Sequence, residues 1–157
     1  MRTSYSQVPL KVKLEIINLQ KCYPIAQNEI KKLARGVLKI EKRDAELNLV
    51  FVDNKQIKEI NKTFLRHNYA TDVLSFAYHE HALHDIITGE ILISAEMAFQ
   101  QAHKRGYPVE GEIALYLVHG ILHLLGYDDR KKGDAKKMHQ RERALLAKFG
   151  YCVPVPD

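Results

Sequence analysis

A chain of 157 residues, of which 46% are hydrophobic and 27% charged, is long enough to bury one core without disulfides. No apolar run approaches the ~20 residues needed to cross a bilayer, and the N-terminus lacks the pattern of a signal peptide. Cys22 and Cys152 stand alone, which is typical of thiols in a reducing compartment, although a disulfide between them stays open. We therefore expect one domain over residues 1–157, in the cytoplasm and not in a membrane. The net charge of +5 weakly favours a polyanionic partner.

The first half of the chain alternates strand and helix patterns. Apolar and polar residues alternate over 10–16, which is the period of a half-buried strand. Apolar residues recur at helical spacing over 26–42, and 46–52 is typical of a strand. Asp53 and Gln56 resemble a capping box and predict that the next helix begins there.

Start and stop signals divide the second half. Ser94 can cap a helix that ends at Gly106, Pro108 suits the first turn of the following helix, and Gly150 ends the last one. The complete prediction is strands at 10–16, 46–52, 73–76 and 90–94 and helices at 26–42, 53–64, 94–106, 108–125 and 133–149. This order predicts an α+β (α/β-like) domain in which a mixed sheet of about four strands packs with about five helices.

The stretch from His119 to Asp129 is the most informative part of the chain. His119 and His123 lie four residues apart and share one face of the helix expected over 108–125. Gly126 can end that helix in a left-handed conformation and let the chain turn back, which brings Asp129 toward the histidines. Two imidazoles and a carboxylate suit a zinc-type site with an open position for water. The alternative is a buried helix with two ordinary histidines.

One residue argues against a peptidase. In zinc peptidases of the H-E-x-x-H type the first histidine is followed by a glutamate that acts as general base, and here that position is Gly120. Glu112, seven residues before His119, lies on roughly the same helical face and could be an outer carboxylate or an ordinary surface residue. A metallopeptidase is therefore a second hypothesis. A third is a non-enzymatic ribosome-associated protein with a structural metal, for which His139 is a conceivable fourth ligand although a surface position suits it better.

Basic residues follow the expected ligands directly. Arg130, Lys131 and Lys132 come next in the chain and are predicted to contact phosphate groups, although cations near helix ends also complement the helix dipole. Three further histidines, His79, His81 and His84, fall in a polar loop expected over 77–88 and are predicted to be loop residues rather than ligands.

Residues 119–128 match the first ten positions of the motif H-G-x-L-H-L-x-G-Y-D-H. This motif is typical of the YbeY endoribonuclease family, which this chain resembles. Ile60–Arg66 and Thr71–Phe76 resemble the family's L-N-x-x-[FY]-R and T-D-V-L-S-F, and Gly89–Ser94 resembles G-D-I-x-I-S. The chain departs from the family pattern at three positions: Asp129 replaces the third histidine, Glu90 an aspartate, and Leu65 the aromatic residue that usually precedes the arginine.

The resemblance implies one zinc ion per chain, or another divalent transition metal, held by His119, His123 and Asp129. It also implies cleavage of single-stranded RNA, roles in ribosomal RNA maturation and ribosome quality control, and association with the small ribosomal subunit. Arg66 falls in the family's active-site block, where it would hold the phosphate during catalysis by the two histidines.

The sequence does not identify the general base. Water activated by the metal could attack the phosphate, or the RNA 2′-hydroxyl could do so. Glu112 and Asp128 are distant candidates for the general base, and Asp128 could instead orient a ligand histidine. We expect RNA to lie in a cleft with Arg66 and the strand at 71–76 opposite the ligand helix. Sequence preference should be weak, because few exposed aromatic residues are evident.

Overall fold

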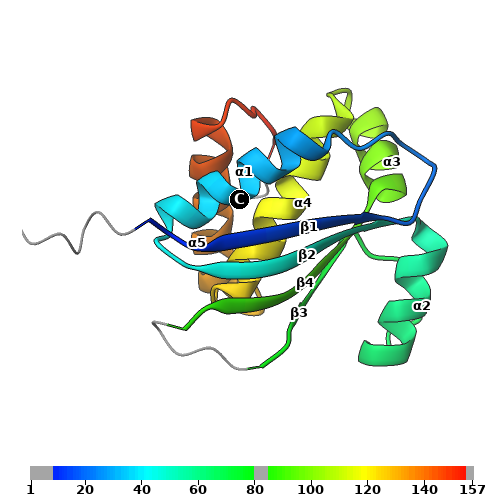
Figure 1. Cartoon of the computed structure of the whole chain (residues 1–157). Coiled ribbons are helices and arrows are strands. Elements are labelled where there is room, and N and C mark those ends of the chain that lie inside the picture. Colours follow the sequence, from blue (N-terminus) through cyan, green and yellow to red (C-terminus); the bar gives the residue numbers. More distant parts are fainter. Residues whose placement is uncertain (1–8, 80–84, 155–157) are drawn as a thin grey trace, which may run out of the picture.

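The computed structural model describes residues 9–79 and 85–154. Figure 1 shows the arrangement of their helices and strands. In chain order the elements are β1 (Val12–Asn18), α1 (Gln27–Ile40), β2 (Ala45–Val52), α2 (Asn54–Leu65), β3 (Val73–Ala77), β4 (Ile87–Ser94), α3 (Ala95–Arg105), α4 (Val109–Leu124) and α5 (Lys132–Lys148). The predicted order of four strands and five helices is confirmed.

The four strands form one mixed sheet in the order β1-β2-β4-β3. β1, β2 and β4 run parallel, and β3 pairs with β4 in the antiparallel direction. β4 begins at Ile87, within the loop that the sequence predicted over 77–88. Its first residues join the sheet because Ile87 is buried and pairs with Ala45, and because Gly89 pairs with Leu47. The fold class is the predicted α+β arrangement.

Local signals explain several boundaries. The side chain of Asp53 accepts from the backbone N–H of Gln56, whose amide oxygen accepts from the N–H of Asp53, both at 2.8 Å. This is the predicted capping box at the start of α2. Ser94 Oγ accepts from the N–H of Met97 at 3.0 Å and so caps α3. Gly106 ends α3 with a positive φ of 78°, a conformation that glycine adopts at little cost.

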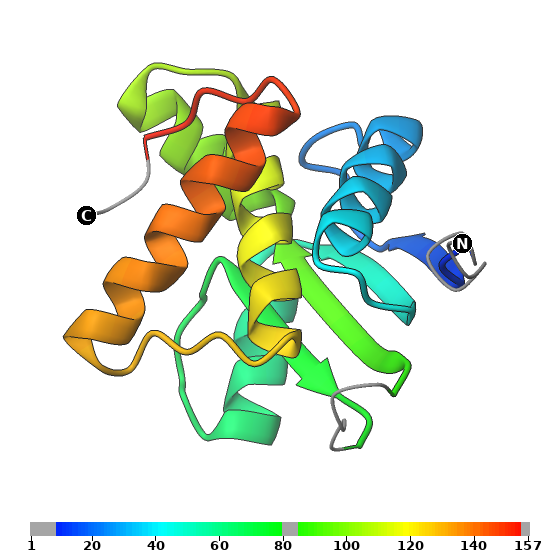
Figure 2. The same cartoon turned by 90° about the vertical axis from the view of Figure 1, so that its left-hand side faces the viewer.

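Helix α4 is the central element of the domain. Figure 2 shows it between α1 and α5, on one side of the sheet, whereas α2 lies apart from this group. Nearly all its residues from Gly111 to Leu122 are buried, which is expected of a helix enclosed on several sides. The two motif histidines are on its last turns, so the metal motif is on a central helix as predicted. None of the helices in the described parts of the chain is long and apolar enough to span a membrane.

Candidate metal centre

The side chains of His119, His123 and Asp129 converge at the end of α4. The Nε2 atoms of the two histidines are 3.0 Å apart, and Asp129 Oδ2 lies 3.6 Å from the first and 3.5 Å from the second. A tetrahedral ion with bonds of 2.0–2.1 Å places its ligand atoms about 3.3 Å from one another. The three donor atoms therefore have the spacing, and the nitrogen and oxygen chemistry, that a zinc-type ion requires.

Each histidine is fixed through its other ring nitrogen. His119 Nδ1 lies 2.5 Å from Oε1 of Glu142, a buried residue of α5. His123 Nδ1 lies 3.1 Å from the backbone oxygen of Tyr127. A carbonyl oxygen only accepts, so Nδ1 of His123 carries the proton, and a carboxylate imposes the same tautomer on His119. In the neutral rings both Nε2 lone pairs then face the space between the three residues, as metal-binding histidines require.

Several influences act on the pKa of His119. The largest single one is burial, which lowers the pKa because it disfavours the charged ring. The hydrogen bond and negative charge of Glu142, followed by the charges of Asp72 and Asp129, together outweigh burial. The pKa of His119 is therefore raised above its ordinary value.

The turn after α4 brings the carboxylate back. Gly126 has a φ of 101°, and the N–H of Tyr127 donates to the carbonyl of Leu122 at 3.0 Å, which closes the end of the helix. Asp128 Oδ2 then accepts from Nε of Arg130 at 2.8 Å, and its Oδ1 accepts from the backbone N–H of Arg130. These two hydrogen bonds lower the pKa of Asp128 to about 2. This pairing places Asp128 against Arg130, whereas the sequence left open that it acts as a distant general base or orients a ligand histidine.

The predicted outer carboxylate is also a different residue. Glu112 is buried, and its Oε1 accepts from Arg105 Nη1 at 3.3 Å and from the hydroxyl of Tyr107. Within the described residues, it makes no hydrogen bond to either histidine. Glu142 occupies the role instead. Its sequence signal was available but ambiguous: it stands four residues after Met138 and three before Leu145, on the buried face of α5.

Gly120 faces the sheet rather than the metal centre. A Cβ on this residue would lie 2.6 Å from Cγ2 of Ile91 and 3.1 Å from Oγ of Ser75. Ser75 Oγ also donates to the carbonyl of Gly120 at 2.9 Å, which ties β3 to α4. A larger residue does not fit here without displacing the sheet. The glycine thus allows close helix–sheet packing, and a glutamate base of the peptidase kind has no room at this position.

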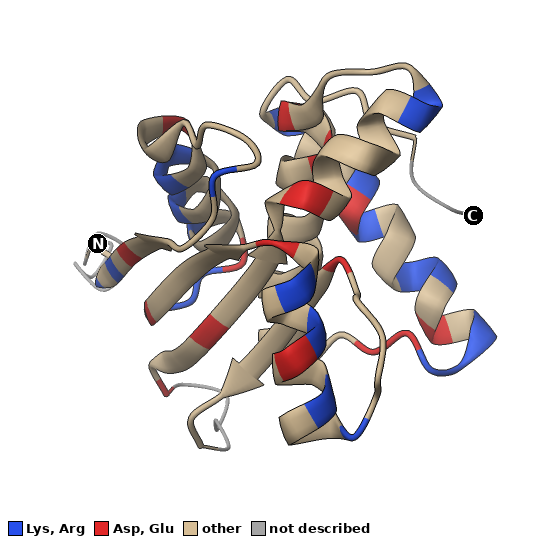
Figure 3. Cartoon of the chain, turned by 90° about the vertical axis from the view of Figure 1, so that its right-hand side faces the viewer, with Lys and Arg blue, Asp and Glu red and all other residues tan. Residues whose placement is uncertain are grey.

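The predicted RNA-binding cations lie outside the pocket at the metal centre. Arg66 is the exposed C-cap of α2, with a φ of 58°, and it does not line the pocket that contains His119. The role that the sequence predicted for Arg66, opposite the ligand helix, stays a prediction. Lys131 and Lys132 are exposed at the start of α5, and Arg130 pairs with Asp128. Figure 3 shows further basic residues on α1, α2 and α5.

The other histidines that the structure describes do not extend the metal centre. Among the described residues, the group with metal-binding spacing comprises His119, His123 and Asp129. His139 lies on α5 in the wall of the same pocket as His119 but outside that group. His79 lies 3.3 Å from the hydroxyl of Thr88, in the groove between β1, β2 and β4. His81 and His84 fall outside the described residues.

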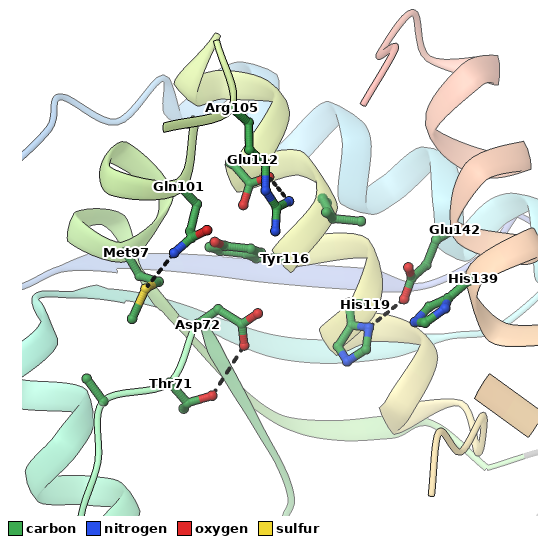
Figure 4. Close-up of a pocket in the computed structure, with 12 residues that line it drawn as sticks. Thr71, Asp72, Met97, Gln101, Arg105, Glu112, Tyr116, His119, His139 and Glu142 are labelled. Atoms are coloured by element: carbon green, nitrogen blue, oxygen red, sulfur yellow. Dashed lines mark hydrogen bonds and ion pairs between the residues drawn. The ribbon is translucent and has the colours of Figure 1, made fainter. Parts of the chain in front are cut away.

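A cavity of about 350 Å³ extends from His119 along α4. Figure 4 shows Arg105 and Glu112 at one side of it, Tyr116 near the middle, and His119 with Glu142 at the other side. Helices α3, α4 and α5 and the segment that precedes β3 contribute its walls. The exposed side chain of Asp129 and the partly exposed histidines leave the metal centre open to this space and to solvent. Such an arrangement can hold an ion and present one side of it to a ligand.

Comparisons with known proteins show which family this chain resembles. A family model described as endoribonuclease YbeY matches residues 15–150. A protein named endoribonuclease YbeY from Syntrophotalea carbinolica is 39% identical over 142 residues, which cover 87% of this chain and 95% of that protein. One of the same name from Fusobacterium nucleatum subsp. nucleatum is 39% identical over 132 residues, covering 79% and 82%.

A solved structure supports the same fold. The solution structure of a Thermotoga maritima protein matches with a TM-score of 0.57 at 24% identity, covering 87% of this chain and 91% of that chain. At that identity the likeness concerns the fold alone. The family model and the two relatives cover most of the sequence, including the whole metal motif. The chain therefore belongs to the endoribonuclease YbeY family.

Proposed function

We propose that this protein is a metal-dependent endoribonuclease that cleaves single-stranded RNA during ribosomal RNA maturation and ribosome quality control in the cytoplasm. The observation that carries the proposal is the paired orientation of the histidines. Their Nε2 atoms meet at 3.0 Å beside Asp129, while Glu142 and the Tyr127 carbonyl hold both Nδ1 atoms. The name shared by the relatives, endoribonuclease YbeY, supplies the class of reaction.

The chain's own residues prepare the centre for the ion. His119, His123 and Asp129 would hold it, and zinc suits this mixture of two nitrogens and one oxygen. When bound, a zinc-type ion polarises a phosphate oxygen and makes water a better nucleophile near neutral pH. Glu142 keeps the ring of His119 in the tautomer that offers Nε2, and the Tyr127 carbonyl does so for His123.

The distribution of charge fits an RNA strand that crosses the metal centre. Lys131 and Lys132 are exposed two and three residues after Asp129 and can contact the phosphates next to the reacting one. Arg66 is exposed at the tip of α2, where it can contact backbone phosphates farther along the strand. We propose that ribosomal RNA on the small ribosomal subunit is the physiological substrate.

Parallel incubations with single-stranded RNA, duplex RNA and an unstructured protein test the proposal. We expect cleavage of single-stranded RNA alone, with about one equivalent of zinc in protein purified without chelator. His123→Ala should lose both the metal and the cleavage, because two ligands hold an ion much less tightly than three. Full RNA cleavage by metal-free His123→Ala would contradict the mechanism, and digestion of the protein substrate would favour a peptidase.

The chemical form of the product ends identifies the attacking group. A 2′,3′-cyclic phosphate indicates attack by the neighbouring 2′-hydroxyl, whereas a linear phosphate as the first product indicates attack by water. The result also bears on the general base, because among the described residues the ligand Asp129 is the one carboxylate that forms an ion pair with the metal-facing Nε2 atoms. If water attacks, we propose that its proton passes to a group within the metal centre itself.

A further inference from the structure

The cavity beside the metal centre contains a second group of polar residues that the proposed cleavage step does not use. Arg105, Glu112 and Asp72 lie in its walls together with the apolar or aromatic side chains of Met97 and Tyr116. Its volume of about 350 Å³ lies within the range of small-molecule sites, about 300–1,000 Å³. Polar and charged side chains outnumber apolar ones in its lining, so the cavity is more polar than a typical small-molecule site and suits a polar organic group.

Glu112 provides the first indication of what binds there. The residue is 1% exposed, and one of its carboxylate oxygens, Oε1, accepts from Arg105 and Tyr107. The other oxygen, Oε2, makes no hydrogen bond of normal geometry within the described part of the chain, although burial first and then the proximity of Glu112 raise the pKa of the Tyr116 hydroxyl. A buried carboxylate oxygen without a donor is costly. A ligand with an N–H group in the cavity would supply that donor.

The charges in the cavity argue against a phosphate as the occupant. Glu112 already pairs with Arg105, the arginine in the wall. Asp72 adds a second carboxylate there, and its Oδ1 accepts from the hydroxyl of Thr71 and the N–H of Val73. Glu142 is a third, beside His119. Acceptor groups therefore predominate over free cationic donors, so a neutral, donor-bearing group fits better than an anion.

We propose that this cavity binds the unpaired base of the nucleotide next to the cleaved bond, and that it favours bases with an amino group over uracil. The inference rests on the proposed RNA substrate and names the part of it that is recognised. Adenine, cytosine and guanine each carry an exocyclic amino group that can donate to Glu112 or Asp72. Uracil instead presents two carbonyl oxygens on either side of one N–H, and those oxygens would face carboxylates.

The position of the cavity gives this recognition a structural role. Its walls include His119, so a base held against Tyr116 and Glu112 could stay attached to a phosphate at the metal centre. An unpaired base can enter such a cavity without the cost of breaking a base pair. The same site would thus favour single strands and introduce a base preference, in contrast to the weak preference that the sequence predicted.

The test maps cleavage sites in an unstructured RNA of mixed sequence and compares the wild type with Glu112→Gln. We expect the wild type to disfavour uracil about tenfold at one fixed position beside the cut. In Glu112→Gln, whose side chain presents an amide nitrogen in place of one oxygen, the bias should fall to within about twofold. Glu59→Gln, an exposed glutamate on α2, is the matched control and should keep the bias.

Binding provides a second readout that does not depend on cleavage. AMP, CMP and GMP should each bind the metal-loaded wild type about tenfold more tightly than UMP, and Glu112→Gln should remove the difference. Should Glu112→Gln fail to fold, Asp72→Asn replaces it, because this residue is exposed and its loss should lower the bias about threefold.

Three outcomes separate the possibilities. Wild-type cleavage without any bias against uracil would overturn the base site and leave the nuclease intact. A bias that survives both Glu112→Gln and Asp72→Asn would overturn the assignment of the site to this cavity. Absence of RNA cleavage would overturn the proposed function, and the nucleotide titrations would then decide whether the cavity binds bases.

Discussion

Glu142 Oε1 lies 2.5 Å from Nδ1 of His119, although 23 residues separate them in the chain. The contact joins α5 to the ligand helix and fixes the ring that must offer Nε2 to an ion. Glu142→Gln keeps the shape but removes the charge, and we expect it to weaken zinc binding about 10–100-fold. Competition with a chromogenic chelator measures this affinity. Glu59→Gln should bind zinc as the wild type does, and unchanged affinity in Glu142→Gln would mean that the contact is merely structural.

The raised pKa of His119 predicts a pH dependence in the metal-free protein. Because the pKa is higher folded than unfolded, the charged pair with Glu142 stabilises the fold fully below the ordinary histidine pKa of about 6.5. That contribution is lost as the pH rises through the raised value. Zinc binding has the opposite trend, since the ion and a proton compete for Nε2. Urea unfolding of metal-free protein from pH 5 to 9 checks the first trend, and Glu142→Gln should flatten it.

Replacing Asp129 tests how the third ligand affects the pH dependence of the reaction. A negative carboxylate offsets part of the metal's charge, whereas a neutral imidazole leaves more of it to act on water. If water is the attacking group, Asp129→His should move the acidic limb of the pH–rate profile to lower pH. Zinc content must be matched between the two proteins. A profile that moves to higher pH, or not at all at equal zinc content, would contradict this account.

The close approach of α4 to the sheet at Gly120 predicts a stability cost. Gly120→Ala brings a methyl group to 2.6 Å from Ile91. Overpacking costs about 1–3 kcal/mol and is partly offset by the ~1 kcal/mol helix propensity of alanine, so the free energy of unfolding should fall by up to about 2 kcal/mol. Gly133→Ala is the matched control, because nothing lies within 4 Å of that site. Thermal unfolding should show a lower Tm for Gly120→Ala alone.

The parts that the sequence predicted correctly depend on neighbours along the chain. Helix and strand periods, the Asp53 cap and the turn at Gly126 act within a few residues, and so does the spacing from His119 to Asp129. The partner of His119 could not be predicted this way, because the contact to Glu142 forms only when α5 packs on α4. Glu112 does share a helical face with His119, but seven residues put it about 10 Å along the axis, beyond contact. The left-handed conformation of Arg66 likewise depends on how α2 ends.

Basic residues near the metal centre should control RNA affinity rather than the chemical step. Lys131 and Lys132 are exposed just beyond Asp129. Replacing both lysines with glutamate should weaken RNA binding at low salt. It should also reduce the slope of log Kd against log salt by roughly one for each phosphate that the protein no longer neutralises.

Arg66→Ala should act similarly but more weakly, raising KM with little change in kcat, because this arginine lies outside the metal-centre pocket. Zinc content should stay at the wild-type level in both variants. An unchanged salt dependence after the lysine reversal would mean that RNA does not pass over Lys131 and Lys132. A large decrease of kcat in Arg66→Ala would mean that this arginine contacts the reacting phosphate.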